Sequence, residues 1–340
     1  MASFVPIHSK FSCVALRSAR VGDLGAGLTS LGNDLWSVPK IPFELQDSWK
    51  EWLGSLQSKE LVGANLCLFA IAHSASPGVL DAENESLRSA VERLFFALVL
   101  QGLQYERGYI LSGAHHEGMI DVRQFTTLRD FHPNPERQPT LITADVLKRS
   151  PLVAKSIEEI FDPVARPGDA SPEPKRFRRL RRGFLALLRG YEEGWWDTRL
   201  HQFVRAIEAL LFLPIGESTK KFAHRSQTFI GATESSHRLL TEMYQLRSCA
   251  EHMNPMEKVL QFPEPDRIAW KRSLESELVA SEIYLRLFRI PELLLRFSDD
   301  DAISAFWHEP DHVVHAMWGN PLDLTAVVDA VYLPIHGLES

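Results

Sequence analysis

The sequence predicts a mainly α protein in which an N-terminal helical or α+β domain is followed by a C-terminal helical bundle. Two observations predict this fold class. Apolar residues recur at helical spacing through most of the second half of the chain, and the segment 163–174 (PVARPGDASPEP) is rich in proline, which interrupts helices and central strands. A length of 340 residues is enough for two domains. We therefore expect a domain of unknown role at 1–162, a linker at 163–174, a bundle at 175–296 and a helical extension at 297–340.

The N-terminal part contains two kinds of pattern. Helical spacing of apolar residues over 46–56, 60–73 and 84–103 predicts three helices. The opening segment, within residues 4–16, and the stretch 109–128, which glycines interrupt, are more typical of strands or ordered loops. We expect this domain to recognise a trigger, an unidentified protein partner or a nucleic acid.

The helical signal is strong and nearly continuous after the proline-rich segment. Asp197 or Thr198 is placed to cap a helix that ends before Pro214, and Ser218 or Thr219 is placed to cap the next one. Each helix carries one apolar stripe and the connections are short, as in helical bundles. The expected helices span about 178–191, 197–213, 218–229, 235–252 and 265–290.

Composition excludes several classes of protein. The 37 Lys and Arg residues are outnumbered by 44 Asp and Glu, so a polyanion must be bound by a local basic patch. No run approaches the roughly 20 apolar residues of a membrane helix. The N-terminus lacks the apolar core of a signal peptide, and Cys13, Cys67 and Cys249 are too scattered for a disulfide framework. We expect a cytoplasmic protein with free thiols and no membrane contact.

The segment Arg247-Ser-Cys-Ala-Glu-His252, at the C-terminal end of a predicted helix, has the residue types needed to cleave RNA without a metal. An imidazole moves protons near neutral pH as general acid or general base, and a guanidinium stabilises charge on phosphoryl oxygens. The nucleophile is the 2′-hydroxyl of the substrate, so no cofactor and no protein nucleophile is required, and DNA is spared. Arg247 and His252 are therefore the candidate catalytic residues.

Three segments in order, RAIEALL at 205–211, STKKFAHRSQTF at 218–229 and EMYQLRSCAEH at 242–252, give the region a resemblance to a known family. Over about residues 195–290 the chain resembles the HEPN domain, in its ApeA-like branch. That family is marked by an Arg, often followed by a polar residue, with four to six residues between it and a His.

Arg247, Ser248 and His252 match this family pattern. The resemblance implies a HEPN-like helical bundle and a metal-independent endoribonuclease, such as a toxin or a defence effector that attacks host or invader RNA under stress. It also implies a homodimer whose interface forms the cleft. Helix geometry agrees with that expectation, because a five-residue step turns about 140° and rises about 7.5 Å, so Arg247 and His252 of one copy do not project side by side.

Two alternatives stand beside this interpretation. In the first, Arg247 pairs with a carboxylate such as Glu208 or Glu251 and His252 only caps its helix. In the second, the chain is a non-catalytic dimer that binds RNA, a nucleotide or a partner protein through the same cleft. An open cleft favours catalysis, whereas burial of the Arg and His in ion pairs favours the alternatives.

A basic run follows the proline-rich segment directly, with apolar residues between its cations. Such a run fits a phosphate backbone, although it also fits a solvated helix face. A smaller basic cluster lies in the predicted helix 218–229. The candidate RNA-binding residues are Lys175, Arg176, Arg178, Arg179, Arg181, Arg182, Lys220 and Lys221.

The sequence His308-Glu-Pro-Asp-His312 matches the zinc-protease pattern H-E-x-x-H, and His315 adds a third imidazole. That pattern works only when both histidines project from one face of a continuous helix. Pro310 makes a turn more favourable than a helix there, so we expect no metal site and no cofactor.

Overall fold

The computed structural model describes most of the chain, and two compact units can be distinguished in it. Unit 1 comprises residues 1–130 and 139–158, and unit 2 comprises residues 131–138 and 159–340. The predicted linker lies outside the described residues except for Pro174. The structure describes residues 4–24, 28–32, 34–41, 43–74, 81–138, 140–161, 174–214, 216–256, 259 and 265–332.

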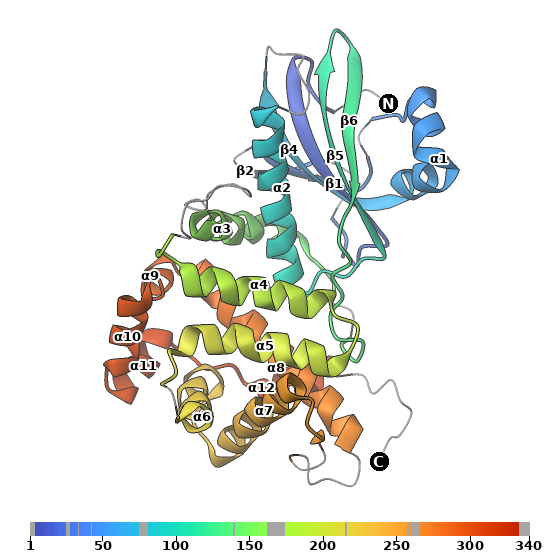
Figure 1. Cartoon of the computed structure of the whole chain (residues 1–340). Helices are drawn as coiled ribbons and strands as arrows, with labels where there is room; N and C mark the ends of the chain where they lie inside the picture. The colour runs from blue at the N-terminus through green and yellow to red at the C-terminus, as the bar shows by residue number, and fades with distance from the viewer. Residues whose placement is uncertain are drawn as a thin grey trace. The chain divides into compact units, whose positions relative to one another are not determined.

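The mainly α fold class predicted from the sequence is wrong, because unit 1 is built on an antiparallel sheet and the chain is α+β (Figure 1). The sheet has six strands in the order β2-β3-β4-β1-β5-β6. Every pairing is antiparallel, with Cys13 of β1 facing Phe69 of β4 on one side and Leu111 of β5 on the other. The strands are β1 (Ser9–Arg17), β2 (Thr29–Gly32), β3 (Leu35–Val38), β4 (Ala64–His73), β5 (Arg107–His116) and β6 (Met119–Thr127).

The helix predicted over 60–73 is the clearest error within unit 1. Helix α1 (Asp47–Val62) ends near the start of this predicted helix, and the apolar run that follows is the central strand β4. Strand β4 is paired on both edges, by β1 and β3, and most of its residues are buried. A strand covered on both faces reads as a continuous apolar run, which periodicity alone does not distinguish from a buried helix.

Helices cover the two faces of this sheet. On one face, Phe11 and Phe69 join a buried cluster that includes Trp49 and Leu53 of α1. On the other, Ser12 of β1 donates a hydrogen bond to the carbonyl of Asn84 in α2 (Ala82–Leu100), which packs along β1 and β4. Helix α3 (Ala144–Phe161) follows the sheet in the chain.

In unit 2 the helices predicted after the linker are confirmed to within a few residues, and three short helices lie in the extension predicted after residue 297. Helices α4 and α5 pack closely together, and α5 also packs on α7 and α8. The helices are α4 (Arg178–Glu192), α5 (Trp196–Leu211), α6 (Ser218–Ile230), α7 (Glu234–His252), α8 (Pro265–Arg289), α9 (Pro291–Leu295), α10 (Asp300–His308), α11 (Asp311–Trp318) and α12 (Leu324–Val331).

The close packing of α4 depends on a small residue. A Cβ at Gly183 would collide with the hydroxyl of Tyr284 on α8 and lie 2.8 Å from the Cβ of Ala209 on α5. Tyr284 uses that hydroxyl to donate a hydrogen bond of 3.0 Å to the carbonyl of Ala206. Glycine at position 183 therefore lets three helices meet around one buried tyrosine.

A buried charge network ties segment 131–138 to the helices of unit 2. Glu277 of α8 is fully buried, and its carboxylate lies 2.9 Å from Arg199 of α5 and 3.0 Å from Arg137. The backbone N–H of Asn134 donates a third bond to it. A buried carboxylate is tolerated when it is paired and hydrogen-bonded in this way. Among the helices of the described residues, none is long and apolar enough to cross a membrane.

Candidate functional site

Arg247 lies on α7 with its guanidinium held between two carboxylates. Its Nη2 atom lies 3.2 Å from Oε2 of Glu208 on α5, and its Nη1 atom donates to Glu251, one turn further along α7. The side chain is only 16% exposed, and Nε is buried without a hydrogen-bond partner among the described residues. Tyr244 lies beside it, with the guanidinium 5.7 Å from the ring centre. The ion pairing named as an alternative for Arg247 is therefore present, with both carboxylates.

His252 is the last residue of α7, and its environment differs from that of Arg247. The side chain is exposed and makes no hydrogen bond or ion pair with residues that the structure describes. The end of the helix is closed by backbone N–H groups, from Met253 to the carbonyl of Ala250 and from Asn254 to that of Cys249. The capping role named as an alternative for His252 is thus not found, and its imidazole faces solvent.

Helix α7 is continuous from Glu234 to His252, so the five-residue separation keeps its helical geometry. Arg247 and His252 of one chain therefore point in directions about 140° apart. Ser248, the polar residue that follows Arg247, is partly exposed and makes no side-chain hydrogen bond with the described residues. A single copy presents the two groups of the motif on different faces.

Sequence reasoning missed His201, which lies on α5 beside Arg247. The ring is half-buried, and its Nδ1 atom is buried without a hydrogen-bond partner among the described residues. Burial, followed by the positive charges of Arg247 and Arg205, lowers the pKa of His201, although a hydrogen bond with the backbone of Arg247 opposes that shift. The sequence does place His201 seven residues before Glu208, two helical turns along the same face, and this spacing could have indicated that His201 lies near the partner of Glu208.

Two carboxylates, Glu208 and Glu251, pair with the one guanidinium of Arg247. The two carboxylates differ in exposure. Glu208 is 28% exposed and also accepts a hydrogen bond from Tyr244, whereas Glu251 is 42% exposed. Glu251 is therefore the more exposed of the two carboxylates that hold Arg247.

The basic run divides into structural and surface residues. Arg181 is almost completely buried and donates to the carbonyls of Ile160, Arg176 and Pro174. The prediction of Arg181 as an RNA-binding residue is therefore wrong, because its guanidinium is buried and donates to three backbone carbonyls. Arg176 is exposed and pairs with Glu159 at 2.8 Å, and Lys175 is exposed.

The other three arginines of the run converge on one pocket of about 190 Å³, which Ala209 of α5 also lines. Arg178 and Arg179 both pair with Asp300 at the start of α10, at 3.0 and 2.7 Å. Burial favours a higher pKa for Asp300, but hydrogen bonds and charge from the two arginines lower it below its ordinary value. Arg182 is exposed on the pocket rim.

The second basic cluster lies on α6. Lys220 is exposed, and Lys221 lines a small pocket of about 180 Å³ with His224 and Arg225. Arg225 is committed elsewhere, since it donates to the carbonyls of Leu211 and Phe212 at the end of α5. The structure does not bring Lys220 and Lys221 together with the arginines of α4 in one pocket.

The zinc-protease pattern is divided between two helices. His308 ends α10 and Asp311 begins α11, with Pro310 at the junction, so His308 and His312 do not share a helix. No group of three or more His, Cys, Asp or Glu side chains suited to a metal occurs among the described residues. The turn predicted at Pro310 is confirmed.

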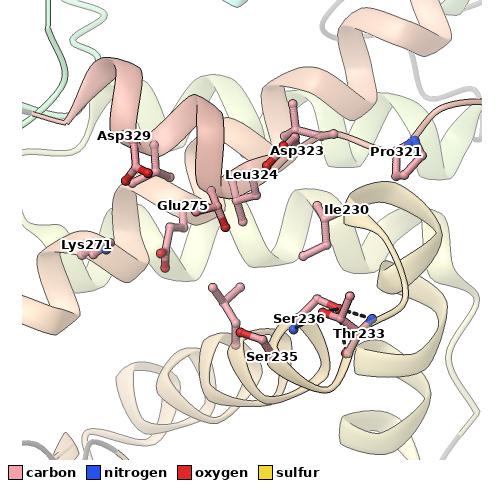
Figure 2. Close-up of a pocket in the computed structure, with 14 residues that line it drawn as sticks. Ile230, Thr233, Ser235, Ser236, Lys271, Glu275, Pro321, Asp323, Leu324 and Asp329 are labelled. Atoms are coloured by element: carbon pink, nitrogen blue, oxygen red, sulfur yellow. Dashed lines mark hydrogen bonds between the residues drawn. The ribbon is translucent and has the colours of Figure 1, made fainter.

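A further pocket, of about 380 Å³, lies between the start of α7, α8 and α12 (Figure 2). Two of its charged groups serve the protein itself: Glu275 is buried against Arg272, and Asp323 caps α12 by accepting from Ala326. Ser236 lies eleven residues before Arg247, about 16 Å away along the helix. This pocket is therefore separate from the motif at the other end of α7.

Comparisons with known proteins add no relative. No family model, curated protein or solved structure matches the chain. The resemblance described above rests on the residues quoted for it, and the function must be argued from the geometry of the site.

Proposed function

We propose that unit 2 is a metal-independent endoribonuclease that uses Arg247 and His252. The observation that carries the proposal is the exposed, unpartnered imidazole of His252 on the same helix end as the fixed guanidinium of Arg247. The substrate 2′-oxygen attacks the adjacent phosphorus and loses its proton to a base, while the bond from phosphorus to the 5′-oxygen breaks and the leaving 5′-oxygen takes up a proton from an acid. His252 moves one of these protons, and Arg247 stabilises the phosphoryl oxygens. The products are a 2′,3′-cyclic phosphate and a 5′-hydroxyl.

The carboxylates around Arg247 fix its orientation before substrate arrives. A guanidinium has five N–H donors. The two ion pairs of Arg247 occupy its Nη2 atom, which faces Glu208, and its Nη1 atom, which faces Glu251. A phosphate that replaces Glu251 finds Arg247 already positioned by Glu208. The carboxylate of Glu251 repels the phosphate until the carboxylate has moved away. The free energy needed to move it therefore reduces the affinity for the substrate.

A homodimer is part of the proposal. The directions of Arg247 and His252 on one α7 diverge, so the imidazole of one copy must work with the guanidinium of another. A twofold axis gives both copies the same surroundings and forms two equivalent sites. No metal or organic cofactor enters this chemistry.

The ion pairs of Arg247 favour a second function, in which unit 2 binds RNA, a nucleotide or a protein without cleaving anything. In that case the guanidinium holds α5 and α7 together through Glu208, and its low exposure reflects a structural role. The two functions differ in a simple way, since only the first requires the imidazole of His252.

The experiment is to incubate the full chain with a mixed RNA pool in EDTA, alongside His252→Ala and Arg247→Ala. We expect cleavage by the wild type and at least a hundredfold loss in each variant, the size typical of lost acid–base or charge stabilisation. The matched control is His237→Ala, an exposed histidine on the same helix, which should retain wild-type activity. Unchanged cleavage in His252→Ala, or activity only with a divalent metal, contradicts the proposal.

A further inference from the structure

The pocket of about 380 Å³ between α7, α8 and α12 has an apolar wall and the size of a small-molecule site, which is roughly 300–1,000 Å³ in proteins. Leu324 and Val328 of α12 are buried in this wall, and Leu239 of α7 and Ile230 of α6 complete it. Figure 2 shows Ile230 and Pro321 near one end of the pocket. This end suits an apolar group.

The other end of the pocket is charged, and Figure 2 shows Lys271 of α8 and Asp329 of α12 near it. Asp329 is exposed and makes no hydrogen bond or ion pair with the residues that the structure describes. The ammonium of Lys271 lies 5.8 Å from the ring centre of Tyr332 and has no ion-pair partner in the described part of the chain. Two opposite charges are therefore open to a ligand at this end.

The pocket has two further carboxylates, and both already have partners. Glu275, one helical turn after Lys271, is almost completely buried and pairs with Arg272. Burial raises the pKa of Glu275, although the charges of Arg272 and Lys271 oppose that shift. Asp323 caps the start of α12. The charges that remain for a ligand are thus those of Lys271 and Asp329.

A ligand with a single charge would match only one of these two groups. An anion that pairs with Lys271 would meet the carboxylate of Asp329, and a cation that pairs with Asp329 would meet the ammonium of Lys271. A head group with both an ammonium and a carboxylate gives each side chain an opposite charge. Asp329 lies five residues after Leu324, about 7.5 Å along α12, so a large side chain reaches from this head group to the apolar wall.

We propose that this pocket binds a free amino acid with a large apolar side chain. Asp329 receives the ammonium and Lys271 receives the carboxylate, while the side chain of the ligand lies against Leu324 and Val328. The site goes beyond the proposed ribonuclease, because none of these residues belongs to the Arg247 site and no step of RNA cleavage uses them.

The test is a calorimetric titration of the full chain with L-phenylalanine and with three analogues that each lack one part of it. The analogue 3-phenylpropanoate lacks the ammonium, 2-phenylethylamine lacks the carboxylate and glycine lacks the side chain. We expect each analogue with one charge to bind about fivefold more weakly than L-phenylalanine, as for a partly solvated ion pair. Glycine should show no saturable binding, because it has no apolar group to bury.

Two substitutions then assign the charges. Asp329→Asn should raise Kd for L-phenylalanine about fivefold but not raise Kd for 3-phenylpropanoate, which has no ammonium to lose. Lys271→Gln should likewise raise Kd for L-phenylalanine but not for 2-phenylethylamine. The matched control is Asp301→Asn, which changes an exposed aspartate in the first turn of α10 and should alter each Kd by less than about twofold.

Equal affinity of the wild type for L-phenylalanine and for either analogue with one charge would overturn the proposal. Equal weakening of L-phenylalanine and 3-phenylpropanoate in Asp329→Asn would overturn the contact assigned to this residue. Unchanged binding in both variants would place the amino acid elsewhere on the chain, and the absence of saturable binding by the wild type would remove the site. None of these outcomes depends on RNA cleavage, so the two proposals fail separately.

Discussion

At Arg247, two carboxylates compete with any anionic substrate for one guanidinium. Sequence reasoning named both carboxylates as alternatives, because Glu251 is four residues from Arg247 and ion pairs at that spacing are common on helices. It did not find His201, whose proximity to Arg247 is a consequence of how α5 packs on α7. The burial of Arg181 could not be predicted either, because a basic run does not show which of its side chains points into the core.

Removal of the charge on Glu251 should make Arg247 more available to phosphate. We expect Glu251→Gln to raise kcat/KM for RNA cleavage several-fold, chiefly through a lower KM, because the net charge around the guanidinium becomes less negative. Steady-state cleavage of a short RNA measures this, with Glu234→Gln in the first turn of α7 as the control. A loss of activity in Glu251→Gln would instead assign this carboxylate a catalytic or positioning role.

His201 should make stability depend on pH. Its folded pKa is lowered, so the folded state binds this proton less readily than the unfolded state, and the contribution to stability is present above the unfolded pKa and lost as the pH falls below it. We expect the fall in Tm between pH 7.5 and 5.5 to be smaller in His201→Asn than in the wild type. Thermal unfolding at several pH values measures this. An identical fall in both proteins would show that protonation of His201 is not linked to folding.

At the scale of elements, the helices of unit 2 were predictable and the central strand β4 of unit 1 was not. An amphipathic helix such as α5 buries one face, so its apolar residues recur every three to four positions and this period is visible in the sequence. Strand β4 is buried on both faces, because Phe69 joins the cluster that includes Trp49 of α1 and because α2 packs along the strand, and this removes the alternation that identifies a strand. The strand was therefore interpreted as a helix, whereas the segments within 4–16 and over 109–128, which were predicted as strands or ordered loops, contain most of β1, β5 and β6.

The meeting of α4, α5 and α8 should depend on Gly183. Alanine is a better helix former by up to about 1 kcal/mol, but its Cβ would collide with the hydroxyl of Tyr284, and overpacking costs typically 1–3 kcal/mol. We expect Gly183→Ala to lower the free energy of unfolding by about 1–2 kcal/mol. Urea denaturation measures this change.

Tyr284→Phe provides the check on that mechanism. In the wild type it removes the bond to Ala206 and should destabilise unit 2, whereas in Gly183→Ala it also removes the colliding hydroxyl and should cost less. Additive effects of the two substitutions would show that the collision with Tyr284 is not the cause.

At the scale of the whole molecule, one observation concerns the fold of the chain and a second concerns the formation of a dimer. The chain folds as an α+β protein with a sheet-based unit 1, and the motif of unit 2 presents its two groups on different faces of α7. The sequence left a helical and an α+β unit 1 open, and the order of the strands could not be predicted because they pair across long stretches of sequence. The second could be predicted, since helix geometry fixes it once the helix is known.

A site shared between two copies predicts complementation. Arg247→Ala and His252→Ala should each be inactive alone, whereas a dimer of one with the other should contain one intact pairing. Random mixing in equal amounts should restore about a quarter of wild-type activity, because half of the dimers are mixed and each has one of two sites. Cleavage assays after co-refolding measure this, and light scattering shows whether dimers form. No recovery in demonstrated mixed dimers would place both groups in one chain.

The most direct measurement concerns the chemistry of the cut. A single RNA of known sequence is incubated with the full chain in EDTA, and the ends of the products are mapped by mass spectrometry, beside the same RNA with one 2′-hydroxyl replaced by hydrogen at the cleavage position. Attack by the substrate's own hydroxyl predicts a 2′,3′-cyclic phosphate, a 5′-hydroxyl and no cut in the deoxy-substituted strand. A cut in that strand, or a 5′-phosphate on the product, would contradict the mechanism assigned to Arg247 and His252.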